Sequence, residues 1–307
     1  MYWAVRCCAQ PIFYIITFKN FTNSVSLSFQ TTSKMKKYLL ILFLVFSGSL
    51  AFAQKTEYET KTNIRYYEDA EYKNDAYKAE RCILDIYYPK NAKGFATILW
   101  FHGGGITQGS KEIPQALKDK GYCIIGVGYR LSPNVKAPAY IEDSAAAVAW
   151  AFNNIAKYGG DANKIFLSGH SAGGYLDLMV GLDKKWLAKY NIDANRIAGL
   201  IPFSPQCITH FTVRKENGIP EKQPVIDQYA PLYWVRGDAP PILLITGNRE
   251  MELLGRYDEN AYMERMMKLN GQKDIRLFEL DGYGHNMADP AYPLLLIEVK
   301  RVLDIKK

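Results

Sequence analysis

The chain has 307 residues, of which 48% are hydrophobic and 22% charged, a balance typical of a globular protein rather than of a disordered or collagen-like chain. The formal net charge of +7 arises mostly at the N-terminus: residues 1–53 hold five basic residues and no Asp or Glu, whereas residues 54–307 hold 33 basic and 31 acidic residues. The second part therefore gives no electrostatic reason to expect nucleic acid as a partner.

Residues 35–53 have the pattern of a secretory signal peptide. Two lysines follow Met35, an apolar run covers Leu39–Phe46, and small residues in an A-x-A arrangement end at Ala53. This pattern predicts cleavage between Ala53 and Gln54 and export to the periplasm or the medium. A transmembrane anchor is the alternative, but the apolar run is well short of the ~20 residues that span a bilayer, so we expect no membrane span after cleavage.

A signal peptide that begins at residue 35 implies that residues 1–34 are an upstream extension from a misassigned start codon. The mature chain would then be residues 54–307, a length suited to one domain.

Strand-like and helix-like segments alternate along residues 54–307. The expected strands are Cys82–Pro89, Ala96–Gly105, Tyr122–Pro133, Lys164–Gly169, Ile197–Ser204, Pro241–Gly247 and Asp274–Leu280; the expected helices are Ile141–Ala156, Ala172–Leu182, Tyr257–Leu269 and Tyr292–Ile305. The central strands are nearly continuous apolar runs, as in strands buried on both faces. The alternation predicts an α/β fold with a mostly parallel central sheet flanked by helices, and the polar segment 206–229 predicts a small cap-like insertion.

Three cysteines remain after signal cleavage, Cys82, Cys123 and Cys207. An odd number in an oxidising compartment leaves at least one thiol unpaired, and the sequence does not decide the pairing. Their spacing matches no metal motif, so we expect no metal.

The segment Lys164–Leu176, "KIFLSGHSAGGYL", carries a G-x-S-x-G pattern centred on Ser171. The predicted strand ends at the first glycine of the pattern, Gly169, and the helix begins right after Ser171, which is the context of a nucleophile elbow. Such a turn holds the serine hydroxyl at a helix N-terminus, where developing negative charge is favoured. Ser171 is therefore the candidate nucleophile.

An earlier predicted strand ends in "FHGGG", Phe101–Gly105. Consecutive glycines let backbone N–H groups approach a ligand closely. In an acyl-transfer site the N–H groups of Gly103, Gly104 and Ala172 would bind the oxyanion.

A serine nucleophile needs a base, and the chain has four histidines. His102 and His170 belong to the two glycine motifs, and His210 lies in the insertion. His285 follows the last predicted strand, at the sheet end where the elbow would lie, so it is the candidate base.

These motifs resemble the α/β-hydrolase superfamily of esterase/lipase type, near its hormone-sensitive-lipase-like and bacterial feruloyl- or acetyl-esterase-like branches. The resemblance covers roughly Ile83 to the C-terminus and implies an α/β-hydrolase fold. In such proteins the triad acid usually lies three residues after the strand-ending glycine, here Gly247, which indicates Glu250. The family usually has Asp there, and the longer reach of glutamate keeps Glu252 as the alternative acid.

The resemblance implies a secreted serine esterase that cleaves carboxylic esters through an acyl-enzyme without a cofactor or metal. Acylated carbohydrates or aromatic esters are the substrates it suggests. A serine peptidase or amidase of the same fold is one alternative, and a non-catalytic hydrolase-fold binding protein is another. Acyl and alcohol specificity and the oligomeric state stay open.

Overall fold

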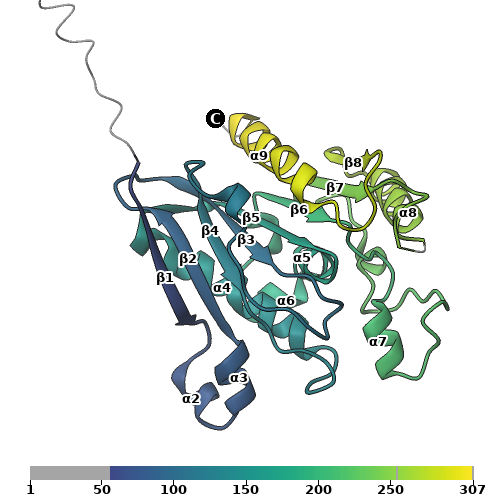
Figure 1. Cartoon of the computed structure of the whole chain (residues 1–307), viewed down its shortest axis with the longest axis horizontal. Coiled ribbons are helices and arrows are strands. Elements are labelled where there is room, and N and C mark those ends of the chain that lie inside the picture. Colours follow the sequence, from purple (N-terminus) through teal and green to yellow (C-terminus); the bar gives the residue numbers. More distant parts are fainter. Residues whose placement is uncertain (1–55, 254, 306–307) are drawn as a thin grey trace, which may run out of the picture. The chain divides into compact units, whose positions relative to one another are not determined.

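A computed structural model describes residues 56–253 and 255–305 (Figure 1). The chain divides into two units, Met1–Gln54 and Lys55–Lys307, and the described residues belong to the second. The predicted extension 1–34 and signal peptide 35–53 lie outside the described residues.

The described unit is built on an eight-stranded sheet in the order β1-β2-β4-β3-β5-β6-β7-β8. The strands are β1 (Tyr58–Arg65), β2 (Ile83–Pro89), β3 (Phe95–Phe101), β4 (Cys123–Val127), β5 (Gly160–His170), β6 (Gly199–Phe203), β7 (Ile242–Gly247) and β8 (Ile275–Leu280). Strand β2 runs antiparallel to both of its neighbours, β1 and β4. The neighbouring strands β4, β3, β5, β6, β7 and β8 are all parallel to one another. The carboxyl ends of the six parallel strands therefore meet at one edge of the sheet, where α/β proteins place their sites.

Helices cover both faces of this sheet because successive strand residues point to opposite faces. Along β3, Leu99 and Phe101 pack into one apolar core with α4 (Ala139–Tyr158), α5 (Ala172–Leu182) and α8 (Arg256–Leu269). Their neighbours Ile98 and Trp100 pack into a second core with α9 (Ala288–Ile305) and the short helix η1 (Gln115–Leu117). All seven residues of β3 are buried, as the apolar run predicted.

The predicted fold class is thus confirmed, and the predicted helix Ala172–Leu182 matches α5 residue for residue. The strand β1 was not predicted, because its sequence YETKTNIR is polar and mostly solvent-exposed at the sheet edge. The helices α2 (Asp69–Lys73) and α3 (Ala76–Arg81) were missed as well, since they are too short for a helical period to be recognised.

The predicted insertion, residues 206–229, lies in the segment between β6 and β7. The segment between β6 and β7 contains α7 (Phe211–Glu216) and η3 (Pro231–Trp234). The segment between β5 and β6 contains α5, the one-turn helix α6 (Lys185–Ala188) and η2 (Ala194–Arg196). In Figure 1, α7 lies at the lower right, below β7 and α8.

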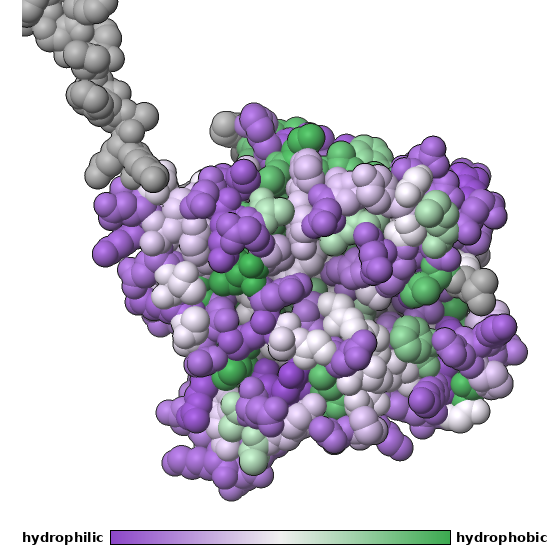
Figure 2. Space-filling view, in the orientation of Figure 1, coloured by the Kyte–Doolittle hydropathy of each residue, from purple (hydrophilic) through white to green (hydrophobic). Residues whose placement is uncertain are grey.

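Cys82, Cys123 and Cys207 are buried free thiols in the described structure. Burial raises the pKa of each of these thiols, which makes them structural rather than reactive. Within residues 56–253 and 255–305, no helix is long and apolar enough to cross a membrane. On the face shown in Figure 2, hydrophobic residues form separate small patches among hydrophilic ones.

Candidate active site

The turn between β5 and α5 forms the predicted elbow. Ser171 has φ 56° and ψ −113°, a strained conformation for a residue with a side chain, and its N–H donates to the Phe203 carbonyl at 2.8 Å. A Cβ on Gly169 would lie 2.6 Å from the carbonyl oxygen of Phe101, and one on Gly173 only 2.0 Å from the same atom. Both glycines of the motif are therefore required for β3 to pass this close to the elbow.

The glycine loop after β3 lies against Ser171. A Cβ on Gly103 would lie 3.7 Å from the Ser171 Cβ, and Gly104 has φ +106°, which favours glycine. No described residue accepts a hydrogen bond from the N–H of Gly103, Gly104 or Ala172. The predicted oxyanion donors are therefore adjacent to the nucleophile candidate and unengaged by the described protein groups.

His285 reaches Ser171 from the loop after β8. Its Nε2 lies 2.9 Å from the Ser171 Oγ. This loop can approach the end of β7 closely because residue 247 is a glycine. A Cβ on Gly247 would lie only 2.4 Å from the Gly284 carbonyl oxygen. On the other side, His170 Nε2–H donates to the His285 carbonyl at 2.7 Å, so a residue of the elbow also holds the backbone of His285.

Of the two candidate acids, the structure brings Glu252 to His285 and leaves Glu250 away from it. Glu252 Oε2 lies 3.0 Å from His285 Nδ1, and the Glu252 side chain is fully buried. Glu250 is exposed, and its N–H donates to Asn248 Oδ1 at 2.9 Å. The preference for Glu250 from the family spacing does not match this geometry, because the chain turns after β7, with the Glu252 N–H bonded to the Asn248 carbonyl at 2.9 Å.

The Glu252 carboxylate accepts four hydrogen bonds. Besides His285 Nδ1, the donors are the Ser204 hydroxyl at 2.7 Å and the backbone N–H groups of Gly247 at 3.2 Å and Leu253 at 3.0 Å. Burial by itself would raise the Glu252 pKa, but the hydrogen bonds from His285 and Ser204 outweigh burial and lower the pKa to about 2. Glu252 is thus a carboxylate at neutral pH, and His285 carries its proton on Nδ1. The Nε2 atom is then free to accept the Ser171 proton.

Ser204, which directly follows β6, was not predicted from the sequence. Its hydroxyl lies 3.0 Å from His285 Nδ1 as well as 2.7 Å from Glu252 Oε1, so it bridges the two groups. Its φ of +45° is unusual for a non-glycine residue, and its carbonyl accepts from the buried Arg256 at 2.5 Å. The signal for Ser204 in the sequence was only its place at the end of an apolar strand, on the edge where the site was expected.

Three histidines near the site are neutral at pH 7: His102 and His210 are buried, and His170 is half-buried. Burial lowers the pKa of His102 to about 4 and that of His170 to about 4, the latter helped by the neighbouring His285, and burial lowers the pKa of His210 strongly. The ordinary histidine pKa is about 6.5. Between pH 6.5 and pH 4 the unfolded chain therefore binds protons that the folded chain does not, and folding stability falls as pH falls.

We expect the free energy of unfolding, measured with urea, to decrease from pH 7.5 to pH 5. Each buried histidine lowers it by up to about 1.4 kcal/mol per pH unit within this window. Glu252 changes the free energy of unfolding only below pH 5. Its contribution is lost between its unfolded pKa near 4.5 and its folded pKa of about 2. A His102→Gln variant should show a shallower decrease, and an unchanged slope in that variant would contradict the assignment.

Known proteins that are similar to this chain include esterases. Residues 84–197 match the family model BD-FAE. Esterase LipC of Mycobacterium tuberculosis is 27% identical over 210 residues, which cover 61% of this chain and 50% of LipC. The chain therefore spans half the length of that relative.

Two solved structures are similar in fold. A truncated carbohydrate esterase from gut microbiota superposes with a TM-score of 0.66 at 19% identity, covering 81% of this chain and 98% of that one. An inhibited esterase B from Lactobacillus rhamnosis has a TM-score of 0.64 at 19% identity, covering 89% and 97%. Together these findings support an α/β-hydrolase superfamily member of esterase/lipase type.

Proposed function

We propose that this protein is an exported serine esterase in which Ser171, His285 and Glu252 form the catalytic triad. The observation that carries the proposal is the continuous hydrogen-bonded chain from the Ser171 hydroxyl through His285 to the buried Glu252 carboxylate, at 2.9 Å and 3.0 Å. Support for a carboxylic ester as the substrate comes from the relatives, which are named as esterases. Export follows from the signal-peptide pattern of residues 35–53.

The geometry accounts for each step of ester cleavage. Ser171 Oγ attacks the carbonyl carbon while its proton moves to His285 Nε2. The negative charge on the former carbonyl oxygen is stabilised by the N–H groups of Gly103, Gly104 and Ala172. The ester C–O bond then breaks, and His285 passes the proton to the leaving alcohol. Water, deprotonated by His285, releases the acid by the same two steps and restores the Ser171 hydroxyl.

Glu252 acts on His285 rather than on the substrate. Its carboxylate fixes the Nδ1–H tautomer and stabilises the imidazolium that forms when Ser171 loses its proton. Burial of the Glu252 side chain strengthens this interaction, because solvent screens it little.

Acylated carbohydrates or aromatic esters are the substrates we propose. Three exposed apolar side chains, Met251, Leu253 and Tyr283, stand next to Glu252 and close to His285 in the chain. Such residues offer contacts to an aromatic or acyl group beside the scissile bond.

A fluorophosphonate probe, followed by peptide mass spectrometry, tests the proposed function. We expect one phosphonylated residue, Ser171, and hydrolysis of 4-nitrophenyl esters and acetylated or feruloylated sugars at rates far above those of the matching amides. Labelling of another residue, or no ester hydrolysis in the full panel, would overturn the proposal.

Ser204→Ala tests the bridge between Glu252 and His285. Loss of one hydrogen bond to a charged group costs about 1.5–3 kcal/mol, so we expect kcat to fall about tenfold or more with KM little changed. The acid limb of the pH profile should move, because the group that orients His285 has changed. Ser168→Ala is the matched control, since its buried hydroxyl donates to the Ile201 carbonyl at 2.6 Å, away from the triad. If both variants have the same pH profile, Ser204 has only a structural role.

A further inference from the structure

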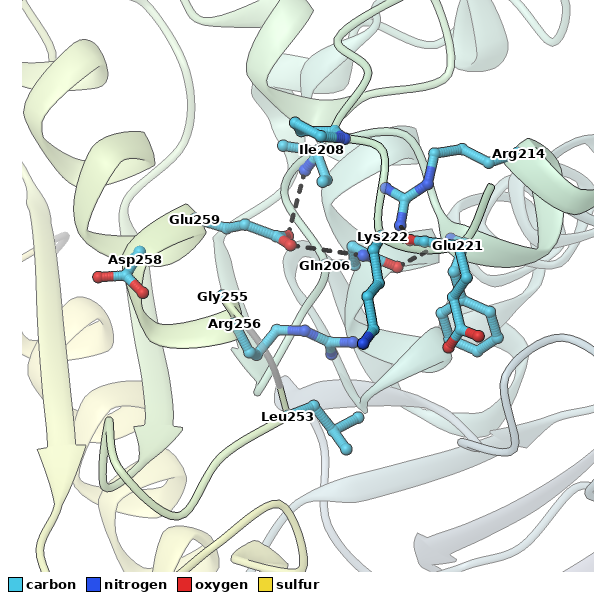
Figure 3. Close-up of a pocket in the computed structure, with 12 residues that line it drawn as sticks. Gln206, Ile208, Arg214, Glu221, Lys222, Leu253, Gly255, Arg256, Asp258 and Glu259 are labelled. Carbon is cyan, nitrogen blue, oxygen red and sulfur yellow. Dashed lines mark hydrogen bonds between the residues drawn. The ribbon is translucent and has the colours of Figure 1, made fainter. Parts of the chain in front are cut away.

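A cavity of about 610 Å³ lies between the insertion and the start of α8 (Figure 3). Part of its wall is apolar, from Ile208, Phe211 and Leu253. The rest of the wall includes charged side chains from α7, α8 and the end of the insertion. The cavity is therefore suited to a ligand that has an apolar body and a charged group.

The cavity adjoins the triad without containing it. Leu253 directly follows Glu252 and donates its N–H to that carboxylate at 3.0 Å. Phe211 packs against the glycine loop, since its ring carbon Cζ lies 2.9 Å from the place of a Cβ on Gly105. A substrate with its ester at Ser171 can thus extend its remote end into this cavity.

Two buried arginines line the cavity, Arg214 with 3% and Arg256 with 2% of its surface exposed. Arg214 donates to the carbonyls of Thr209 at 2.8 Å and Glu221 at 2.5 Å, and Arg256 donates to that of Ser204. In each guanidinium the Nε atom is buried and has no hydrogen-bond partner. Both side chains therefore keep donor capacity that the described protein groups leave unused.

Neither arginine has a carboxylate within ion-pair distance among the described residues. The nearby Glu259 instead accepts from the N–H of Cys207 at 2.9 Å and of Ile208 at 3.4 Å. Burial lowers the pKa of both guanidinium groups, opposed mainly by the charge of Glu259. Arg256 also feels the charge of Glu252, but that carboxylate bonds to His285 and Ser204, and Arg214 also feels Glu221, which is solvent-exposed. Neither guanidinium group therefore has a carboxylate partner of its own, and a bound anion would stabilise both.

The remaining charged residues of the wall are at its exposed rim. Glu221, Lys222 and Asp258 are all solvent-exposed, so water screens their charges. Figure 3 shows the Lys222 and Arg256 side chains extending into the region between the insertion and α8. The interior of the cavity thus holds the two guanidinium groups and the carboxylate of Glu259.

We propose that this cavity binds a carboxylate at the end of the ester substrate remote from the scissile bond, with Arg214 and Arg256 as its ligands. The substrate class is an ester that carries a free carboxylate on an apolar or sugar body, such as an ester of a hydroxylated aromatic acid or of a sugar acid. Guanidinium groups match carboxylate oxygens in charge and planarity. This inference rests on the proposed esterase function and specifies its substrate.

Matched pairs of esters test the inference. The first pair is 4-acetoxybenzoate and its methyl ester, with the charge on the alcohol side; the second is mono-4-nitrophenyl succinate and 4-nitrophenyl butyrate, with the charge on the acyl side. We expect the charged member of at least one pair to have a kcat/KM about tenfold higher in the full chain. Arg214→Gln should lower that value about 10- to 100-fold and change the neutral ester less than twofold.

Lys215→Gln is the matched control, because Lys215 is the next residue on α7, is exposed and does not line the cavity. Lys215→Gln removes the same single positive charge, and we expect it to leave the kcat/KM of both ester pairs unchanged. Equal loss of acidic-ester hydrolysis in Lys215→Gln and Arg214→Gln would mean that net charge, not the pocket, selects the substrate, and would overturn the inference.

Binding of benzoate to the Ser171→Ala full chain, measured by calorimetry, separates this inference from the proposed function. We expect benzoate to bind, benzamide not to bind, and Arg214→Gln to abolish benzoate binding. Benzoate binding without any ester hydrolysis by the wild type would support the pocket and refute the esterase. Ester hydrolysis with no charge preference, together with no benzoate binding, would refute the carboxylate pocket but leave the esterase function standing. Binding of phosphate or sulfate without binding of benzoate would also refute the carboxylate pocket.

Discussion

Ser171→Ala is expected to lower ester hydrolysis by about 10⁴-fold or more while the protein stays folded. The substitution removes the Ser171 Oγ, the proposed nucleophile, which lies 2.9 Å from His285 Nε2. Loss of a triad nucleophile costs this much because the oxyanion donors alone supply only the residual catalysis. The measurement is kcat/KM on 4-nitrophenyl acetate, together with the midpoint of thermal unfolding.

Ser110→Ala is the control for this prediction, since Ser110 is an exposed serine in the loop that follows the glycine motif. It should retain full activity and the fluorophosphonate label, which Ser171→Ala should lose. Retention of wild-type activity by Ser171→Ala would refute the proposed mechanism.

Glu252→Gln should reduce kcat by about 10⁴-fold, as when the triad aspartate of a serine protease is replaced by asparagine. The glutamine amide carries no charge to stabilise the imidazolium of His285, and its NH₂ group can hold the ring in the wrong tautomer. Glu252 acts on His285 and not on the substrate, so the loss should appear in kcat rather than in KM.

Glu250→Gln provides the direct comparison, because it makes the same chemical change two residues earlier. Glu250 is exposed and away from His285, so we expect an activity within about twofold of the wild type. A large loss in Glu250→Gln with little loss in Glu252→Gln would return the acid role to the position that family spacing indicates.

Much of the fold could be predicted because its strongest signals are local. The continuous apolar runs of the central strands indicate burial on both faces, and the Gly169–Gly173 elbow marks a strand-to-helix junction. Edge elements gave no such signal. The polar strand β1 joins the sheet through backbone pairing with β2, which leaves almost no pattern in the side chains.

Some residues of the candidate site could likewise be predicted from local sequence signals, and others could not. Ser171 and His285 were predicted from the sequence as the nucleophile and base candidates, because the first has a motif and the second is one of four histidines and follows the last strand. The structure places their Oγ and Nε2 atoms 2.9 Å apart. The acid was ambiguous, since two glutamates lie within three residues and a spacing rule cannot describe how the loop turns. The hydrogen bond between the Glu252 N–H and the Asn248 carbonyl decides that turn.

The sequence by itself determined the architecture and singled out the candidate nucleophile, the candidate base and the glycine loop, because motifs and periodicity are properties of short segments. Only the tertiary structure decided that Glu252 rather than Glu250 meets His285, that Ser204 bridges them, and that Arg214 and Arg256 share one cavity. Ser204, Glu252 and His285 come from the segments after β6, β7 and β8, Arg214 comes from α7, and Arg256 begins α8. Their proximity depends on how the parallel strands align their carboxyl ends, and no spacing along the chain encodes that distance.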